Sequence, residues 1–156
     1  MTSPDLAAER LLVRVIDTAP DLDEALRSAV FGLAATADRY HWVGIYLLDG
    51  DTLVLHNQSG KSTPHTRIPV SQGLCGAAAR ERQTIVVDDV RQDPRYLACS
   101  LETRSEIVVP VMSAAGRILG EIDIDSSDLA AFGPEDRRLL ETVAAALAAR
   151  IEAARE

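Results

Sequence analysis

Apolar residues recur at helical spacing near both ends of the chain. Ser3 and Pro4 are typical of a helix start, and Asp21 with Glu24 resembles a capping pair for a second helix. The apolar face of this second helix consists of Leu22, Ala25, Leu26, Ala29, Val30 and Leu33. The pattern predicts helices over about 4–37, with a break at Pro20, and a long amphipathic helix over about 134–154.

Short apolar and β-branched runs fill the region between these helices. Residues 42–48 and 52–56 flank Asp49-Gly50, which is a strong hairpin signal. Further strands are expected at 67–70, 84–87, 107–112 and 118–125, with a short Ala-rich helix ending near Arg82. Residues 88–104 have no clear period and are expected to form a long irregular loop of the kind that often carries function.

This order of elements predicts an α+β fold in a single domain over 1–156. The N-terminal helices occupy about 4–37, the sheet and a pocket about 40–126, and the C-terminal helix about 134–154. We expect a mostly antiparallel sheet with the helices packed on one face. The other face is then open for a ligand.

Composition and charge narrow the class of protein. With 47% hydrophobic and 26% charged residues, the chain has the composition of an ordinary soluble globular domain. The formal net charge of −8, without a run of basic residues, argues against nucleic-acid and anionic-membrane partners. The chain has neither a secretory leader pattern nor an apolar run long enough to span a membrane, so we expect a cytoplasmic protein.

Period-2 alternation separates the two faces of the predicted sheet. Trp42, Gly44 and Tyr46 point away from the helices, which leaves a gap over the glycine where a small apolar group fits between two rings. Glu121, Asp123 and Asp125 alternate in the same way along the last strand. Buried carboxylates need a partner, so this face is either solvated or binds something cationic, such as a small amphiphile that carries an amine. Core packing of the aromatic pair and a solvated acidic face are the simpler alternatives.

The only two cysteines are Cys75, in GLCG, and Cys99, in YLACS. A structural disulfide is disfavoured in the reducing cytoplasm, so they are either buried apolar residues or a transient redox pair. The three histidines are scattered without the spacing of a metal site, and no metal or nucleotide motif is present, so we expect no bound cofactor.

Several segments together carry a family resemblance. The runs HWVGIYLLDGDTLVL, RIPVSQGLCGAAA, YLACSLETRSEIVVPV and GEIDIDS resemble the free methionine-R-sulfoxide reductases, a catalytic branch of the GAF domain family, from about Tyr40 to Leu140. The resemblance implies a GAF-like fold and reduction of free methionine-R-sulfoxide. It implies that Cys99 attacks the sulfoxide and that Cys75 resolves the oxidised form. It also implies a substrate pocket formed by Trp42, Tyr46, Glu106, Asp123 and Asp125.

Two features depart from the family pattern. Members usually carry another cysteine between GK and RIPV, whereas Lys61 and Arg67 here enclose Ser62, Thr63, Pro64, His65 and Thr66. Glu121 stands where the family more often has an aliphatic residue.

The chemistry of such a site sets further expectations. A thiolate attacks sulfur while a proton is delivered to the departing oxygen, which leaves a sulfenic acid for a second thiol to condense with. We expect Arg95 or Arg104 to lower the pKa of Cys99, and the helix N-terminus to activate Cys75. A cluster of Glu106, Asp123 and Asp125 can keep one carboxyl protonated as the catalytic acid, for which we select Glu106.

The sequence therefore predicts a thiol-dependent reductase of free methionine-R-sulfoxide that is regenerated by thioredoxin. We also expect a homodimer formed through the terminal helices. The alternatives are a noncatalytic GAF sensor that retained the pocket, which the missing cysteine favours, and a purely structural dimer module.

Overall fold

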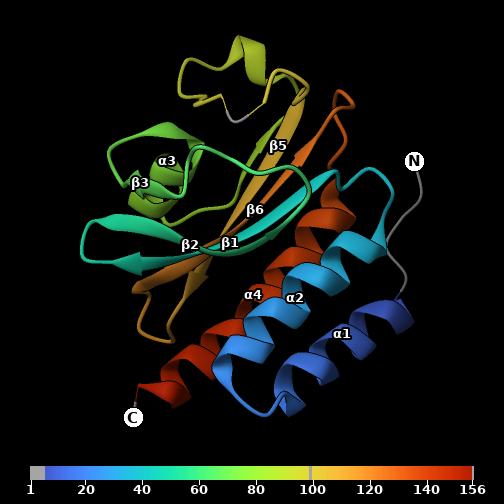
Figure 1. The fold of residues 1–156 in the computed structure, drawn as a ribbon, viewed down its shortest axis with the longest axis vertical. Coiled ribbons are helices and arrows are strands. Elements are labelled where there is room, and N and C mark those ends of the chain that lie inside the picture. The colour runs from blue at the N-terminus through green and yellow to red at the C-terminus, as the bar shows by residue number, and fades with distance from the viewer. Residues whose placement is uncertain (1–5, 99, 156) are drawn as a thin grey trace.

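The computed structural model describes residues 6–98 and 100–155. Helices and strands follow one another in nearly the predicted order (Figure 1). The elements are α1 (Leu6–Thr18), α2 (Leu22–Thr36), β1 (Trp42–Asp49), β2 (Thr52–Ser59), β3 (Arg67–Pro69), α3 (Gly73–Glu81), β4 (Ile85–Val87), the 3₁₀ helix η1 (Val90–Gln92), β5 (Ser105–Met112), β6 (Ile118–Ser126) and α4 (Pro134–Ala154).

The helix ends are stabilised by local hydrogen bonds. Asp21 is the N-cap of α2, and its side chain accepts a hydrogen bond of 2.8 Å from the backbone N–H of Glu24. At the start of α4, Asp136 accepts the backbone N–H of Gly133 and also binds the side chains of Arg39 and Tyr40. The start of α4 is therefore tied to the segment that leads into β1.

The sheet is six-stranded with the order β3-β2-β1-β6-β5-β4, and every strand pairing is antiparallel. The predicted hairpins β1–β2 and β5–β6 are confirmed. The long central strands β1, β6 and β5 place Gly44 opposite Asp123, and Glu106 opposite Asp125. This register brings residues from distant parts of the sequence to the centre of one face.

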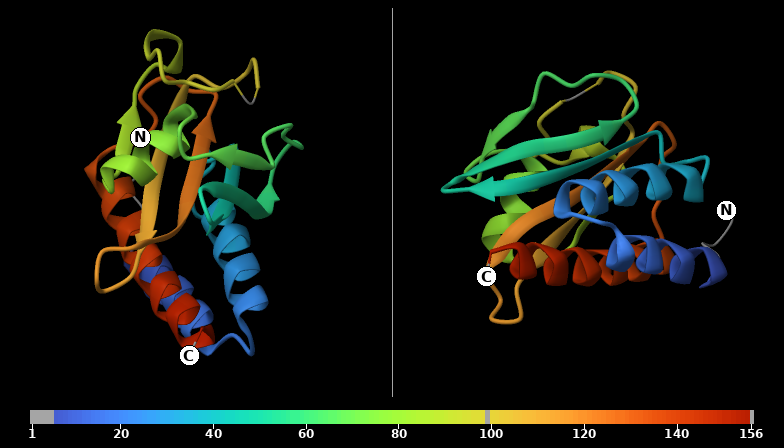
Figure 2. Two further views of the ribbon diagram at one scale, coloured as in Figure 1. Left: turned by 90° about the vertical axis from the view of Figure 1, so that its left-hand side faces the viewer. Right: turned by 60° about the horizontal axis from the view of Figure 1, so that its bottom comes forward.

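One face of the sheet packs against α2 and α4, and α1 packs on these two helices, as Figure 2 shows from two sides. Val43 and Ile45 of β1 and Ile122 and Ile124 of β6 belong to this core, so the predicted alternation is confirmed. The prediction of an open opposite face was wrong. There α3 and its neighbouring segments cover a second core that includes Tyr46 and Cys75. A pocket is left at one edge of this covered face.

The connection between β4 and β5 is mostly irregular, as predicted, apart from the short helix η1. Asp89 begins this turn by accepting the backbone N–H of Arg91 at 3.1 Å. Among the residues that the structure describes, no helix has the length and apolar character needed to cross a membrane.

Candidate active site

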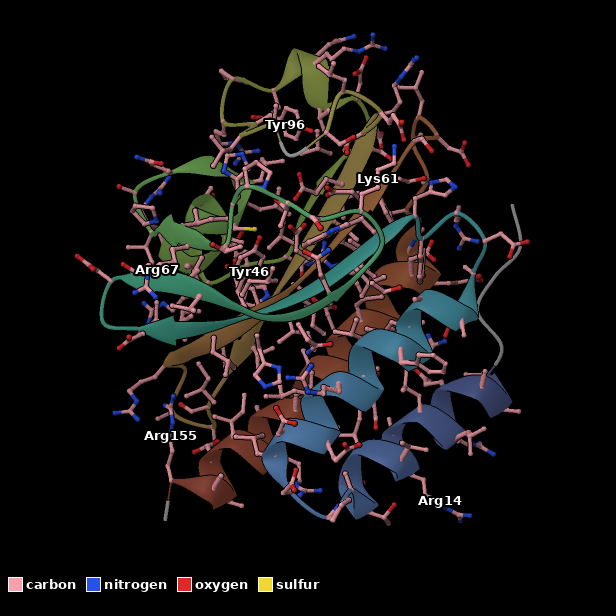
Figure 3. All side chains as sticks on the ribbon, in the orientation of Figure 1. Arg14, Tyr46, Lys61, Arg67, Tyr96 and Arg155 are labelled. Atoms are coloured by element: carbon pink, nitrogen blue, oxygen red, sulfur yellow. The ribbon has the colours of Figure 1, made fainter. Side chains whose placement is uncertain are left out.

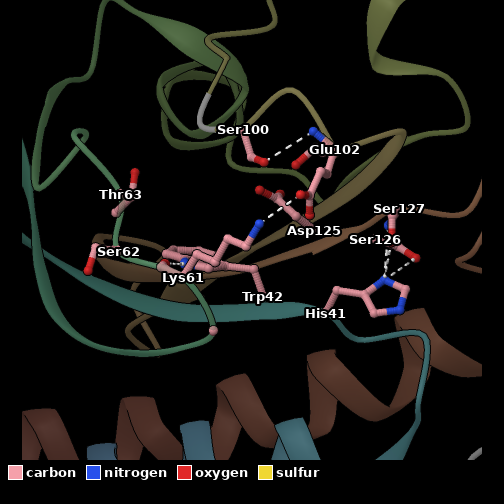
Figure 4. Close-up of a pocket in the computed structure, with 12 residues that line it drawn as sticks. His41, Trp42, Lys61, Ser62, Thr63, Ser100, Glu102, Asp125, Ser126 and Ser127 are labelled. Carbon is pink, nitrogen blue, oxygen red and sulfur yellow. Dashed lines mark hydrogen bonds and ion pairs between the residues drawn. The ribbon is translucent and has the colours of Figure 1, made fainter.

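An open pocket of about 200 Å³ lies where the end of β6 meets the connection after β2 and the end of the β4–β5 connection (Figure 4). It contains two of the predicted site residues, Trp42 and Asp125. Its lining consists of His41, Trp42, Gly60, Lys61, Ser62, Thr63, Ser100, Glu102, Thr103, Asp125, Ser126 and Ser127. The pocket therefore combines one indole wall with hydroxyl and charged groups.

Trp42 forms the apolar wall, and its position depends on two glycines. A Cβ on Gly44 would lie 2.3 Å from the Trp42 ring, so the indole lies directly over this residue. The prediction of a gap over Gly44 between the two aromatic rings was wrong, because the indole of Trp42 fills this space. At Gly60, where φ is +112°, the chain turns over Trp42, and the indole Nε1 donates to the Lys61 carbonyl at 2.9 Å.

Tyr46 has a different place from the one expected. Its side chain is fully buried in the second core, and it does not line the open pocket. The hydroxyl donates to the His65 carbonyl at 2.8 Å. Tyr46 and Lys61 both extend on the side of the sheet away from α1, α2 and α4 (Figure 3). Tyr46 thus stabilises the 60–66 segment through this hydrogen bond from the second core.

The 60–66 segment is held against the end of the β4–β5 connection by two contacts. Lys61 Nζ lies 2.7 Å from a Glu102 carboxylate oxygen, and His65 Nε2 lies 2.7 Å from the Ala98 carbonyl oxygen. Both contacts bridge the edge of the site. The segment in which the family usually has another cysteine therefore does lie beside the YLACS segment.

Four carboxylates gather beneath α3 on the covered face of the sheet. Glu106, Glu121, Asp123 and Asp125 are all buried, with exposed fractions of 0–4%. Both oxygens of Glu121 and one oxygen each of Asp123 and Asp125 have no hydrogen-bond partner. Within residues 6–98 and 100–155, no basic side chain pairs with Glu121, Asp123 or Asp125. The alternative of a solvated acidic face was therefore wrong.

Burial raises the pKa of three of these carboxyl groups, those of Glu121, Asp123 and Asp125. Desolvation raises the pKa of Glu121 and Asp125 well above its ordinary value, and the charge of Asp123 raises both further. Desolvation also raises the pKa of Asp123. Glu106 is in hydrogen-bonding contact with Asp123 and with Asp125, and a bond between two carboxyl groups requires a proton on one of them. Burial, rather than the expected like-charge repulsion, is the largest cause of these raised pKa values. The role of the cluster as a proton donor stays a prediction.

Cys75 lies in the first turn of α3 and faces this cluster. Its sulfur is 3.5 Å from Asp123 Oδ2, and only 4% of the residue is exposed. A smaller cavity of about 10 Å³ lies between Cys75, Glu106 and Asp123, with Ile68, Gly73, Leu74 and Leu97 completing its lining. Burial, followed by the charges of the four carboxylates, raises the pKa of the Cys75 thiol well above its ordinary value. The expected activation by the helix N-terminus was therefore wrong.

Cys99 lies outside the described residues. Of the two arginines expected to lower its pKa, Arg95 forms ion pairs with Asp93 at 2.8 Å and with Glu81 at 3.5 Å. This arginine is therefore already neutralised by two carboxylates, which makes it a weak candidate for activating a thiol.

Several pocket residues were missed in the sequence. His41 was considered only as one of three histidines without the spacing of a metal site, yet it lines the pocket, and its Nδ1 accepts the backbone N–H of Ser127 at 2.9 Å. Lys61 and Glu102 lie in connections without periodicity, so no pattern marks them. Ser126 and Ser127 directly follow the acidic strand, and this adjacency was the one signal available for them.

The chain is similar in sequence and fold to several known proteins. The model of the GAF domain family matches residues 21–151. A free methionine-R-sulfoxide reductase of Saccharomyces cerevisiae is 40% identical over 107 residues, which are 67% of this chain and 59% of that protein. The Escherichia coli enzyme of the same name is 39% identical over 107 residues, 69% of this chain and 64% of that protein. The chain thus spans less than two thirds of these curated relatives.

A solved structure covers more of the chain. The free methionine-R-sulfoxide reductase of Neisseria meningitidis, determined in complex with its substrate, is 37% identical, with a TM-score of 0.89 over 99% of this chain and 95% of that one. Domain model, curated relatives and solved structure lead to the same assignment. The chain belongs to the GAF domain family and, within it, to the group of the free methionine-R-sulfoxide reductases.

Proposed function

We propose that this protein reduces free L-methionine-R-sulfoxide to L-methionine. The observation that carries the proposal is the group of four buried carboxylates beside a pocket with an indole wall. A free amino acid offers an ammonium group that such carboxylates can pair with. The names of the relatives support the same substrate.

In the proposed complex, Trp42 contacts the apolar part of the substrate, Asp123 and Asp125 bind its ammonium group, and Glu106 contacts the sulfoxide oxygen as the proton donor. Asp125 lines the open pocket, whereas Asp123 lines only the smaller cavity beneath α3, so an amine entering the pocket reaches Asp125 first. We assign Tyr46 to the substrate site through the 60–66 segment, which its hydroxyl holds in place.

The proposed reaction begins at Cys99. Its thiolate attacks the sulfoxide sulfur, the carboxyl group of Glu106 delivers a proton to the oxygen, and oxygen passes to the cysteine as a sulfenic acid while methionine is released. Cys75 then attacks the sulfenic sulfur, which forms a disulfide and releases water. Because the Cys75 thiol is buried, this second step needs a movement of α3 or of the β4–β5 connection that exposes it.

We further propose a thioredoxin-like dithiol as the reductant, without another cofactor, and a cytoplasmic location, where free thiols persist. A homodimer through the terminal helices is supported by exposed apolar residues. Leu11 of α1 is 62% exposed, and Phe31 of α2 is 79% exposed.

The test is a thioredoxin-coupled turnover assay with each epimer of free methionine sulfoxide. We expect turnover of the R epimer alone, loss of activity in Cys99→Ser, and formation of sulfenic acid without disulfide in Cys75→Ser. N-acetylmethionine sulfoxide should react poorly, because an uncompensated buried carboxylate costs several kcal/mol.

Each alternative has its own result in this assay. Binding of the sulfoxide without turnover would identify a sensor domain. Equal rates on the free and acetylated substrates would show that the carboxylates do not bind the amine. Normal turnover by Cys75→Ser would assign the resolving step to an external thiol.

A further inference from the structure

The open pocket contains one permanently charged basic side chain. Lys61, the single lysine of the chain, is the only lysine or arginine in the pocket lining among the residues that the structure describes. His41 also lines the pocket, but its Nδ1 accepts the backbone N–H of Ser127 at 2.9 Å, which requires an unprotonated nitrogen. Lys61 is therefore the positive charge that an anionic group meets on entering this pocket.

In the structure this charge is paired with an acidic side chain of the pocket itself. Lys61 Nζ lies 2.7 Å from Glu102 Oε1, and Figure 4 shows the two side chains meeting beside the pocket. They are 75% and 67% exposed, so water and salt screen the pair and it opens easily. The backbone of Lys61 is held independently of the pair, because its carbonyl oxygen accepts from Trp42 Nε1 at 2.9 Å and from Gln58 Nε2 at 2.7 Å.

The substrate of the proposed reaction carries an ammonium group and a carboxylate on the same carbon atom. Its ammonium group is proposed to bind Asp123 and Asp125. Its carboxylate therefore enters a pocket whose lining already contains the carboxyl groups of Asp125 and Glu102. A further anion at this place is unfavourable unless a cation pairs with it. Lysine suits this role, because its ammonium group is a compact charge on a flexible stem and can change its partner.

From these observations we infer that the Lys61–Glu102 ion pair is a latch, which the α-carboxylate of the substrate opens. The carboxylate replaces Glu102 on Lys61 Nζ, and the Glu102 side chain turns to solvent. The inference rests on the proposed function, because it concerns how the same substrate is bound. Lys61 is then the residue that binds the α-carboxylate, whereas Glu102 competes with the substrate for Lys61 and raises its KM.

The experiment compares methionine-R-sulfoxide with the corresponding sulfoxide of methioninol, in which a hydroxymethyl group replaces the carboxylate and the ammonium group remains. Lys61→Met keeps the length of the side chain and removes its charge. It should raise the KM for methionine sulfoxide about tenfold, the loss expected for a hydrogen bond between charged groups. The kcat and the KM for methioninol sulfoxide should not change, because only binding of the carboxylate is lost. Lys61→Arg should restore most of the affinity.

Glu102→Gln tests the competing side of the exchange. Removing the competitor should lower the KM for methionine sulfoxide about two- to fivefold, without an effect on methioninol sulfoxide. In the double variant of Lys61→Met and Glu102→Gln this gain should disappear, because Glu102 acts only through Lys61. Glu135→Gln, at an exposed carboxylate in the first turn of α4, is the matched control and should leave both KM values unchanged.

Three results would overturn the inference. They are an unchanged KM for methionine sulfoxide in Lys61→Met, an equal loss on methioninol sulfoxide, and a gain from Glu102→Gln that persists without Lys61. Circular dichroism establishes that each variant is folded, and the fluorescence of Trp42 measures methionine binding in variants that do not turn over. If wild type neither binds nor reduces these compounds, the proposed function fails as well, whereas the three results above contradict the inference alone.

Discussion

The sulfur of Cys75 lies 3.5 Å from an oxygen of Asp123, and both side chains are buried between α3 and the centre of the sheet. Burial raises the pKa of each group, so the neutral thiol and the protonated carboxyl are favoured together. Both groups therefore favour their protonated forms as long as they remain buried. Reaction at Cys75 requires that the pair be separated or exposed to water.

Replacing Glu121 should change how stability depends on pH. Burial raises the pKa of Glu121 well above 4.5, so the folded chain keeps a proton that the unfolded chain releases. The free energy of unfolding consequently falls as pH rises from about 4.5 through the folded-state pKa, by up to about 1.4 kcal/mol per pH unit. Glu121→Gln removes this loss. Urea unfolding from pH 4.5 to 8 should therefore show that the free energy of unfolding of the variant, relative to wild type, increases with pH.

Glu102→Gln is the control for this experiment. Lys61 lowers the pKa of Glu102, so this exposed carboxylate stabilises the folded state as pH rises, and its replacement should not produce the relative gain in stability expected for Glu121→Gln. A stability difference between Glu121→Gln and wild type that stays constant with pH would contradict the prediction.

A methyl group at Gly44 should disturb the indole wall. The added Cβ would lie 2.3 Å from the Trp42 ring, so the ring must move, at a cost of about 1–3 kcal/mol in the free energy of unfolding. Trp42 is the single tryptophan of the chain, so its fluorescence emission reports this movement directly. We expect a shifted emission maximum and weaker sulfoxide binding in Gly44→Ala.

The matched change is Gly133→Ala, where the nearest atom to the added Cβ is 3.9 Å away. Its emission spectrum should equal that of wild type. Unchanged fluorescence in Gly44→Ala would mean that the indole does not lie over this glycine in solution.

Removing the His65 side chain should loosen the segment that contains Cys99. The hydrogen bond of 2.7 Å to the Ala98 carbonyl is lost in His65→Ala. A hydrogen bond of this kind contributes about 1 kcal/mol, which is about fivefold in a local opening equilibrium. Trypsin should therefore cut faster after Arg95 or Arg104.

His56→Ala serves as the control, because His56 contacts Asp23 of α2, on the opposite side of the sheet. Its cleavage rate should match wild type. Equal acceleration in the two variants would indicate a general loss of stability.

Asp136→Ala should destabilise the fold strongly while leaving the site residues in place. Asp136 caps α4 and binds the side chains of Arg39 and Tyr40, and its removal leaves these buried groups without their carboxylate. Breaking a buried pair of this kind costs about 3–5 kcal/mol. Urea denaturation measures the loss, and the exposed neighbour Glu135→Ala should remain within about 0.5 kcal/mol of wild type.

Alternation along the strands predicted which side chains share a face. Trp42, Tyr46, Asp123 and Asp125 do lie on the face away from the three long helices, because the side-chain period of a strand is two. What covers that face could not be predicted. The 9-residue helix α3 is too short for its apolar pattern to show where it packs, and its position depends on distant contacts with β5 and β6.

The edge of the site was beyond prediction for a related reason. The contacts Lys61–Glu102 and His65–Ala98 join two irregular segments that are more than 30 residues apart in the sequence. No periodicity places such segments side by side. The pKa of Cys75 was likewise misjudged, because the helix start is visible in the sequence but the burial of its thiol is not.

The carboxylates of the site are carried by strands at the centre of the sheet, whereas its edge consists of connections. β6 is hydrogen-bonded on both sides, so the backbone amide of Asp123 should exchange with deuterium only through global unfolding. Amides of the 60–66 segment should exchange much earlier. Residues at the edge can therefore change during evolution with little effect on the fold. Every substitution among the central carboxylates, by contrast, also changes the stability of the whole domain.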